Sequence, residues 1–252
     1  MDPYQQVAQW LCSSGHVVAF TGAGISTESG IPDFRSPGGI WATSTPVYFD
    51  DFVASSESRY EYWRQKAAAH RDFAGSQPNA GHVVLAGWEK RGLLQGVVTQ
   101  NIDGLHQLAG SSQVIELHGT ARKIACLQCQ ERYDAEEMVS QFLTTEQVPD
   151  CPECGGMIKH ATISFGQSLV PEVLEHAMAL AQRADLLLVM GSSLVVEPAA
   201  SLPRMARGRG ARVVIVNRDK TPHDDIADLL FHEGIGGALE RINQYVEEGF
   251  CE

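Results

Sequence analysis

The sequence predicts an α/β protein in which a Rossmann-like parallel sheet is covered by helices on both faces and a small metal-binding module is inserted. Short apolar runs with the length of buried strands alternate with segments that have helix signals, and this alternation is typical of a parallel sheet. The first run leads directly into paired glycines, as a mononucleotide-binding fold begins. Two Cys-x-x-Cys pairs interrupt the pattern and indicate the metal module.

The composition of the chain limits its partners. Of its 252 residues, 44% are hydrophobic and 20% are charged, which is an ordinary globular balance. The formal net charge of −12 argues against direct binding of nucleic acid, because duplex-binding proteins carry a basic surface. No apolar run is long enough to span a membrane, and the N-terminus lacks the features of a secretory signal. We therefore expect a cytoplasmic protein that binds neither membranes nor nucleic acid.

The opening motif covers residues 17–36, VVAFTGAGISTESGIPDFRS. After the strand, Gly22 permits a tight turn, and Gly24 allows a pyrophosphate to approach the backbone without meeting a Cβ atom. Residues 25–27 can begin a helix whose free amide groups face the anion. Thr27 stands where the dinucleotide fingerprint has its third glycine. A plain strand–turn–helix is therefore the alternative.

A loop with binding chemistry follows the glycines. Pro32 disfavours a helical conformation at the residue before it, so the helix should end there. Asp33, Phe34 and Arg35 come next. An arginine can hold a phosphate with two hydrogen bonds, and a phenylalanine can cover a ring. The alternative is an ordinary surface loop with two solvated charges.

The remaining elements follow from apolar runs, caps and turn residues. Asp2 and Pro3 begin a first helix that Gly15 ends. An aromatic stripe within residues 46–73 is interpreted as core packing. Further helices are expected within residues 46–73, 78–91, 171–184, 198–205 and 235–246, and further strands at 93–99, 114–117, 185–190, 212–216 and 229–231.

A polar cluster follows the expected strand 93–99. Gln100, Asn101 and Asp103 lie beyond its carboxyl end, which is where ligands bind in an open α/β sheet. An Asx turn followed by a helix cap uses the same residue types and is the alternative. The ends of two later strands carry Ser192 and Asn217, and small or amide residues there suit a dinucleotide that lies along this edge.

Two histidines lie near the same edge. His106 falls in an expected short helix, which favours a structural role. His118 ends the strand 114–117, so its ring should point into the crevice. An imidazole has an unperturbed pKa of about 6.5 and is a suitable general base at such a position. The alternative is a second structural histidine.

Four cysteines form two knuckles that are separated by 21 residues. This spacing matches a tetrahedral four-thiolate zinc site, which would be closed and structural. Two disulfides or free thiols are the alternatives, and a reducing compartment disfavours disulfides. The four expected ligands are Cys126, Cys129, Cys151 and Cys154.

The cysteines also divide the chain. We expect a zinc module over residues 121–160, inserted in a larger nucleotide-binding domain of residues 1–120 and 161–252. The other two cysteines, Cys12 and Cys251, are expected to be unpaired.

Taken together, these motifs closely resemble the sirtuins, which are NAD-dependent protein-lysine deacylases. GAGIS, SGIPDFRS, TQNIDGLH, HG, the two Cys-x-x-Cys pairs, GSSLVVEPA and VIVN occur in the family's order, from about residue 17 to 246. The chain is similar to the compact bacterial and archaeal members. The resemblance implies a Rossmann-like domain with a zinc-ribbon domain, NAD as cosubstrate, one structural zinc, and acyl-lysine proteins or peptides as partners.

The resemblance also implies roles for individual residues. The catalytic residues would be His118 and Asn101. The substrate peptide would add as a strand between two edges, Ile163, Ser164, Phe165 and Gly166 on one side and Leu194 and Val195 on the other. The NAD-binding residues would be Gly22, Ala23, Gly24, Thr27, Asp33, Phe34, Arg35, Gln100, Asn101, Ile102, Asp103, Gly191, Ser192, Ser193, Asn217 and Ile235.

The sequence departs from one sirtuin pattern. Members that prefer succinyl or malonyl lysine carry a Tyr-x-x-Arg pair in the helix after the first loop. Here Tyr60 is followed three residues later by Trp63, and Tyr62 by Gln65. Short neutral acyl groups are therefore expected.

Three other functions compete with deacylation. Protein ADP-ribosyl transfer would use the same site with a different nucleophile. An NAD-dependent dehydrogenase would normally have glycine at Thr27. A zinc-ribbon binding module that only senses NAD would not need the polar cluster or the histidine at the strand end.

Overall fold

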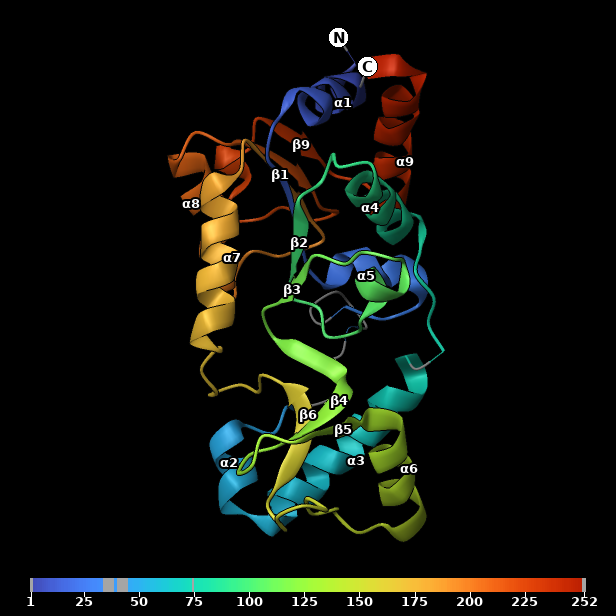
Figure 1. Cartoon of the computed structure of the whole chain (residues 1–252), viewed down its shortest axis with the longest axis vertical. Helices are drawn as coiled ribbons and strands as arrows, with labels where there is room; N and C mark the ends of the chain where they lie inside the picture. The colour runs from blue at the N-terminus through green and yellow to red at the C-terminus, as the bar shows by residue number, and fades with distance from the viewer. Residues whose placement is uncertain (1, 34–38, 40–44, 74, 251–252) are drawn as a thin grey trace.

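The molecule consists of two bodies placed along its long axis (Figure 1). The computed structural model describes residues 2–33, 39, 45–73 and 75–250. One body contains a six-stranded sheet and lies at the end with both termini, and the other contains a three-stranded sheet. Among the described residues, no helix is both long and apolar enough to cross a membrane.

The large sheet is parallel throughout and has the order β3-β2-β1-β7-β8-β9. Two halves therefore start from neighbouring central strands, β1 and β7, and run outward in opposite directions. This is the doubly wound arrangement, and its ligand crevice lies where the strand order reverses. The strands are β1 (Val17–Thr21), β2 (Gly96–Thr99), β3 (Val114–Glu116), β7 (Leu186–Met190), β8 (Arg212–Val216) and β9 (Leu229–Phe231).

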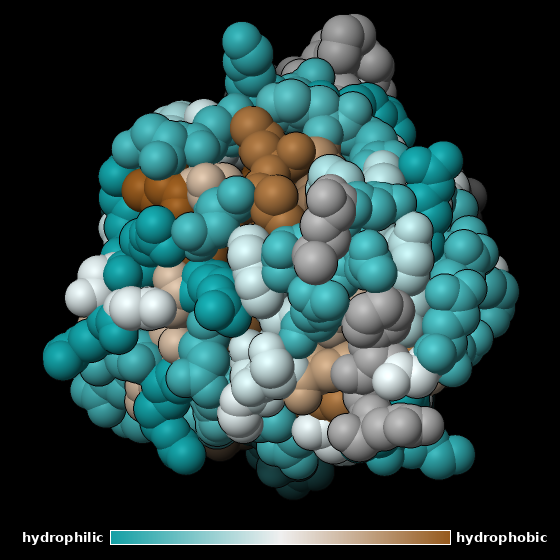
Figure 2. Space-filling view, turned by 90° about the horizontal axis from the view of Figure 1, so that it is seen from above, coloured by the Kyte–Doolittle hydropathy of each residue, from teal (hydrophilic) through white to brown (hydrophobic). Residues whose placement is uncertain are grey.

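Helices cover both faces of this sheet, as the apolar runs predict. Alternate residues of β1 face opposite sides: Val17 and Ala19 belong to one core cluster, and Val18 and Phe20 to the other. On the first face lie α1 (Pro3–Ser13), α4 (Ala80–Lys90) and α9 (Ile235–Tyr245), and on the second α7 (Pro171–Arg183) and α8 (Leu202–Gly208). Seen from above, the end near the termini is mainly hydrophilic, with hydrophobic side chains confined to a few areas (Figure 2).

The small body is built from two separate stretches of the chain. Its antiparallel sheet has the order β5-β4-β6, formed by β5 (Arg132–Asp134), β4 (Gly119–Cys126) and β6 (Ile158–Thr162). Against it pack α6 (Ala135–Thr145) and also α2 (Phe49–Ala54) and α3 (Ser56–Phe73).

Helices α2 and α3 change the expected division of the chain. Trp63 is fully buried in one cluster with Phe142 and Ile158, and its indole N–H donates to the Ile158 carbonyl at 3.2 Å. Of the aromatic stripe, Phe52, Trp63 and Ala67 pack in the core of the small body, whereas Val53 and Tyr60 are each 40% exposed. We therefore propose that residues 49–73 belong with the cysteine-bearing segment and not with the large sheet. The sequence did not predict this, because apolar periodicity shows that a helix is buried but does not show which element it packs against.

Several element ends differ from the sequence-based expectations. Strand β2 begins at Gly96 instead of residue 93, because Gly92 has a φ of 75° and the amides of Leu93 and Leu94 donate back to the Trp88 carbonyl. The helix expected over 198–205 is a 3₁₀ turn at Ala199–Ser201 that continues as α8. The shorter elements are the 3₁₀ helix Ala23–Ser29, α5 (Leu105–Leu108), the 3₁₀ turn Asp224–Ile226 and the π turn Val246–Phe250.

One expectation about the cysteines was wrong. Cys12 is disulfide-bonded and is therefore not the unpaired thiol that was expected. Cys251 lies outside the described residues. Nothing in the sequence spacing indicated a pair, because disulfide partners are set by distance in the fold.

Candidate active site

The glycine motif joins the two central strands at the switch point. The Gly22 amide donates to the Met190 carbonyl at 3.0 Å, and the Gly24 amide donates to Gly191 at 2.8 Å. A Cβ atom on Gly24 would lie 2.6 Å from the Cα of Gly191, which itself has a φ of 64°. Glycine is thus required here for contact between two backbones, which differs from the reason expected from the sequence, namely the approach of a pyrophosphate.

The residues after the glycines form a 3₁₀ helix, Ala23–Ser29, and not an α-helix. It ends at Gly30, which has a left-handed φ of 83°. The Thr27 hydroxyl donates to the Gly24 carbonyl at 2.9 Å, so the residue in place of the third glycine closes the turn. Asp33 is partly buried at the end of this segment, and the expected cofactor residues Phe34 and Arg35 lie outside the described residues.

Asn101 and Asp103 share one buried partner, Ser26. Ser26 donates its hydroxyl to the Asp103 carboxylate at 2.7 Å and accepts from the Asn101 amide at 3.1 Å. Asn101 also donates to the Gly22 carbonyl at 3.2 Å, and the second carboxylate oxygen of Asp103 accepts from the Leu105 amide at 2.9 Å. The polar cluster and the glycine motif therefore form one hydrogen-bonded unit. An isolated Asx turn would not need these bonds to Ser26 and Gly22.

Gln100 connects this unit to both sides of the crevice. Its side-chain amide donates to the Ser192 hydroxyl after β7 at 2.7 Å. Its backbone carbonyl lies 2.9 Å from Nδ1 of His118. A carbonyl can only accept, so Nδ1 of His118 carries the proton and donates. In the neutral ring, Nε2 is then the unprotonated nitrogen.

The environment of His118 favours the neutral imidazole. Its ring is partly buried, and burial lowers the pKa below the usual value, although the bond to the Gln100 carbonyl opposes this. The sequence placed His118 at a strand end facing the crevice. The structure puts it in the two-residue turn between β3 and β4, with the proton on the nitrogen that faces the protein.

His118 is also tied to the first of the two expected peptide edges. The Ile163 amide donates to the His118 carbonyl at 2.8 Å. The next residues form an open loop in which Phe165 is 41% exposed and contacts the ring of Tyr48, with centroids 5.9 Å apart. Gly166 closes the loop with a φ of 83°.

The second expected edge begins on the β7 side. Leu194 has a φ of 52°, and its amide donates to the Ser192 hydroxyl at 3.2 Å. Its side chain is buried in the same cluster as Leu117, the residue before His118, whereas Val195 is 51% exposed. Ser193, between Ser192 and Leu194, is partly buried.

Other expected cofactor residues stand at the ends of the crevice. Asn217 follows β8 and donates its amide to the Asp219 carbonyl at 2.6 Å, within its own loop. Ile235 begins α9 and is buried in the same cluster as Ile25. Ile102 is partly buried, and its carbonyl accepts from the Ala121 amide at 2.8 Å, which joins the polar cluster to β4.

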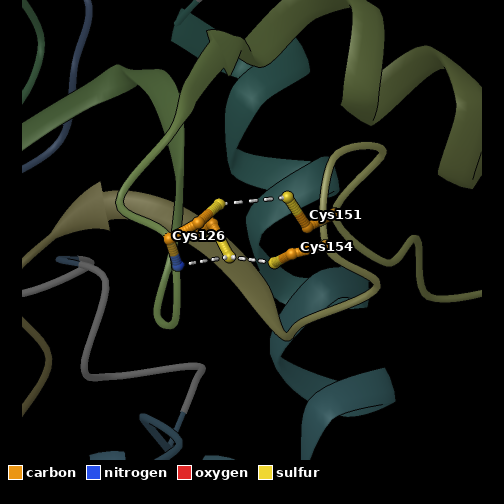
Figure 3. A group of neighbouring side chains, drawn as sticks. Cys126, Cys151 and Cys154 are labelled. Atoms are coloured by element: carbon orange, nitrogen blue, oxygen red, sulfur yellow. Dashed lines mark hydrogen bonds between the residues drawn. The ribbon is translucent and has the colours of Figure 1, made fainter.

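The four knuckle cysteines converge in the small body, and Figure 3 shows Cys126, Cys151 and Cys154 facing one another. All four sulfur atoms lie within 4.8 Å of one another. The Sγ atoms of Cys126 and Cys154 are 3.5 Å apart and those of Cys129 and Cys151 are 3.6 Å apart. A disulfide would need about 2.05 Å, whereas a tetrahedral zinc with Zn–S bonds of about 2.3 Å separates its sulfurs by about 3.8 Å. The donor set therefore fits one closed, structural zinc site.

Comparison with known proteins identifies the family. The Sir2 family model matches residues 22–198. The chain belongs to the Sir2 family. It is 44% identical over 237 residues to an NAD-dependent protein deacetylase of Rhodopseudomonas palustris, with 93% of this chain and 94% of that protein covered. An NAD-dependent protein deacetylase of Thermotoga maritima is 42% identical over 233 residues, with 92% of each chain covered.

Solved Sir2 structures have the same fold. A Sir2 complex with a p53 peptide and NAD+ superposes with a TM-score of 0.86 at 39% identity and covers 98% of each chain. A Sir2 variant bound to a deacetylated p53 peptide and 3′-O-acetyl ADP ribose gives 0.86 at 38% identity, over 98% of this chain and 99% of that one.

Sequence reasoning missed one layer of the candidate site. Beneath the polar cluster, the Thr21 hydroxyl donates to that of Thr99 at 2.8 Å and lies 2.9 Å from Nε2 of His106. His106 contacts His82, with ring centroids 4.8 Å apart, and burial lowers the pKa of His106 to about 3. His106 is therefore a neutral, buried residue, as its position in a helix predicted. A threonine at the end of each of two adjacent apolar strands was the signal that could have revealed this layer.

Proposed function

We propose that this chain is an NAD-dependent protein-lysine deacetylase that consumes NAD and releases nicotinamide, O-acyl-ADP-ribose and the free lysine side chain. The observation that carries the proposal is the placement of His118. Its ring is oriented by the Gln100 carbonyl, and its own carbonyl holds Ile163 of the peptide edge. These two bonds would hold a base between the proposed nucleotide site and the proposed substrate edge. The names of the relatives and the ligands of the Sir2 structures support the same activity.

The NAD site that we propose lies along the carboxyl ends of β1, β2 and β7. The residues that would bind the cofactor there are Gly22, Ala23, Gly24, Thr27, Asp33, Phe34, Arg35, Gln100, Asn101, Ile102, Asp103, Gly191, Ser192 and Ser193, with Asn217 and Ile235 toward the adenosine. The buried carboxylate of Asp103 is suited to accept from the nicotinamide carboxamide, because a buried anion oxygen is a strong acceptor.

The proton chemistry falls to His118. NAD would supply the ribose carbon to which the acyl oxygen is transferred when nicotinamide leaves. His118 would then take a proton from a ribose hydroxyl through Nε2, and Asn101 would orient the reacting group. With Nδ1–H bonded to Gln100, the imidazole is already the correct tautomer for a base. A cleft formed by both bodies would exclude water from the reacting carbon.

The acyl-lysine substrate would bind in extended form. A peptide strand between residues 163–166 and 194–195 would be held mainly by main-chain hydrogen bonds. Exposed apolar side chains beside these edges, Phe165, Tyr48 and Val195, fit contact with such a peptide.

We propose that the acyl group is short and neutral. On α3, the side chain of Tyr62 is buried and that of Tyr60 contacts Phe142, with centroids 5.7 Å apart. Arg64 is paired with Glu61 at 2.7 Å. This arginine therefore already has a carboxylate partner on its own helix, which supports the expectation from the missing Tyr-x-x-Arg pair.

Labelled NAD separates the proposed function from its alternatives. With NAD labelled in the adenine ring and an acetyl-lysine peptide, we expect the label in acetyl-ADP-ribose. Label retained on protein would instead show ADP-ribosyl transfer, and a reversible absorbance change of the nicotinamide would show a dehydrogenase.

The reduced state of the four knuckle cysteines fits the cytoplasm as the proposed location, although Cys12 is disulfide-bonded.

A further inference from the structure

Lys159 on β6 is a buried cation held by uncharged oxygens. Its side chain is only 2% exposed. Its ammonium donates to the Thr162 carbonyl at 2.5 Å and the His160 carbonyl at 3.2 Å, with a longer contact of 3.5 Å to the side-chain oxygen of Gln167. Of the residues that the structure describes, no carboxylate lies within ion-pair distance of it. Burying an unpaired charge costs free energy, so its position calls for a functional reason.

The oxygens around Lys159 bracket the first peptide edge. Thr162 is the last residue of β6, immediately before Ile163, and Gln167 follows Gly166. Gln167 also closes the loop: its side-chain oxygen accepts from the Ser164 amide at 3.1 Å, and its own amide donates to the Ser164 carbonyl at 3.0 Å. The loop is thus fixed at its start by the His118 carbonyl and at its end by Lys159 through Gln167.

The groups that surround Lys159 are mostly basic. Helix α3 places Lys66 near it, and both ammonium groups lie over the ring of Tyr62, at 5.6 and 5.7 Å from its centroid. Neither ring nitrogen of the neighbouring His160 has a hydrogen-bond partner among the residues that the structure describes, and burial lowers its pKa well below the usual value. The ring of His70 lies 6.4 Å from that of His160 and is 2.8 Å from the exposed carboxylate of Glu136. A carboxylate is thus absent from the immediate surroundings of the Lys159 ammonium in the described structure.

We propose that Lys159 is a positioning residue for substrate binding, whose charged ammonium holds residues 163–166 in the shape that pairs with the acyl-lysine peptide. It acts through Thr162 and Gln167 and touches neither substrate nor NAD. The inference rests on the proposed function, because it takes 163–166 as the peptide edge. It adds a residue in the small body that sets peptide affinity.

The hold of the Lys159 ammonium on residues 163–166 should weaken as pH rises. Burial, reinforced by the charge of Lys66, lowers the pKa of Lys159 to about 7. A neutral amine keeps only two N–H donors and turns a lone pair toward a carbonyl oxygen. Peptide binding should therefore weaken above pH 7. The free energy of unfolding should instead rise with pH between pH 7 and the usual lysine pKa. In this range the unfolded chain binds more protons than the folded one.

The test measures binding of a fluorescent acetyl-lysine peptide to the zinc-loaded full chain by anisotropy, beside steady-state kinetics. For Lys159→Met at pH 7, we expect peptide Kd and KM to rise at least about tenfold, with kcat at saturating peptide and the KM for NAD nearly unchanged. For the parent protein, Kd should rise by about tenfold between pH 7 and 8.5 while the melting temperature does not fall.

Three further variants make the test specific. Gln167→Glu places a carboxylate beside the ammonium, and Lys66→Met removes a like charge, so each should move the rise in Kd to higher pH. Lys123→Met, which removes an exposed lysine of the same body that is paired with Asp134, should change nothing. If Lys159→Met does not fold, Gln167→Ala replaces it and should raise peptide Kd severalfold.

Two results would overturn the proposal. One is an unchanged peptide Kd in the Lys159 and Gln167 variants. The other is loss of zinc, of thermal stability and of NAD binding in proportion to the loss of peptide binding, since this would show a purely structural role. Because anisotropy does not need turnover, a parent protein that binds the peptide but releases no nicotinamide would refute the deacetylase function alone.

Discussion

At the scale of single residues, the account depends most on the protonation of His118. Its pKa is lowered by burial, and a base must be neutral to act. We therefore predict that turnover at saturating substrates rises with pH through a region below the usual histidine value of about 6.5 and is level at neutral pH. A pH–rate profile of kcat checks this, and a rise centred well above 6.5 would contradict it.

Removing the imidazole should separate two steps of the reaction. His118→Ala should lower deacetylation by about 10²–10⁴-fold, the usual contribution of a positioned base. The Ser26, Asn101 and Asp103 unit remains intact, so exchange of labelled nicotinamide into NAD should continue when acetyl-lysine peptide is present. Both rates are measured on one preparation. Equal loss of exchange and deacetylation would place His118 at an earlier step, and near-normal deacetylation would remove it from the mechanism.

Asp103 provides a second test at this scale. Its carboxylate accepts from the Ser26 hydroxyl and the Leu105 amide, and we propose that it also accepts from nicotinamide. In Asp103→Asn an NH₂ group replaces one acceptor oxygen, so nicotinamide inhibition should weaken at least about tenfold and the KM for NAD should rise. Inhibition constants for nicotinamide decide the matter: the same constant in variant and parent would refute the assignment.

At the scale of elements, the glycines of the switch point give a prediction with a built-in control. A methyl group on Gly24 would meet the Gly191 backbone at 2.6 Å and push β1 away from β7, whereas Gly87 on α4 has no atom within 4 Å of its Cβ position. Gly24→Ala should therefore destabilise the fold by about 1–3 kcal/mol and weaken NAD binding.

The control substitution on α4 should change the stability of the fold in the opposite direction. Gly87→Ala should stabilise the fold by roughly 0.5–1 kcal/mol, because alanine loses less entropy in a helix. Urea unfolding midpoints of the two variants give the comparison, and a Gly24→Ala protein as stable as its parent would show that the two backbones can separate at no cost.

The cysteine module gives the next prediction. Removing zinc, or changing Cys151→Ser, should unfold the three-stranded sheet and loosen the α3 packing, with loss of activity. Trp63 reports this directly, since it is fully buried and bonded to the Ile158 carbonyl. Its fluorescence should shift to longer wavelength on chelation and return on adding zinc. Full activity and an unchanged spectrum in a metal-free preparation would contradict a structural zinc.

Elements were predicted from the sequence where the information is local. Apolar runs gave the six strands of the large sheet, and the cysteine spacing gave four sulfurs that converge. The element ends at residue 93 and residue 198 were misplaced because backbone turns, such as the one at Gly92, override the apolar pattern. The 3₁₀ form of Ala23–Ser29 was missed because the Gly24 contact with Gly191, which shapes it, is made by a strand far away in the sequence.

At the scale of the whole molecule, the sequence could not predict which elements far apart in the chain pack side by side. Alternation predicts a parallel sheet, but the order β3-β2-β1-β7-β8-β9 depends on crossovers that no local pattern encodes. The same holds for α2 and α3, which join the small body across a long stretch of chain. The strand-end residues Gln100, His118 and Ser192 were nevertheless predicted to share one edge, because parallel strands end on the same side.

We propose that the protein transfers an acyl group from lysine to NAD-derived ribose. The most direct measurement uses a peptide whose lysine carries an isotopically heavy acetyl group, incubated with NAD and the zinc-loaded protein and analysed by mass spectrometry. The account predicts heavy acetyl on ADP-ribose, in equal amount to the nicotinamide released and the lysine freed. Heavy acetate without acetyl-ADP-ribose, formed whether or not NAD is present, would contradict it.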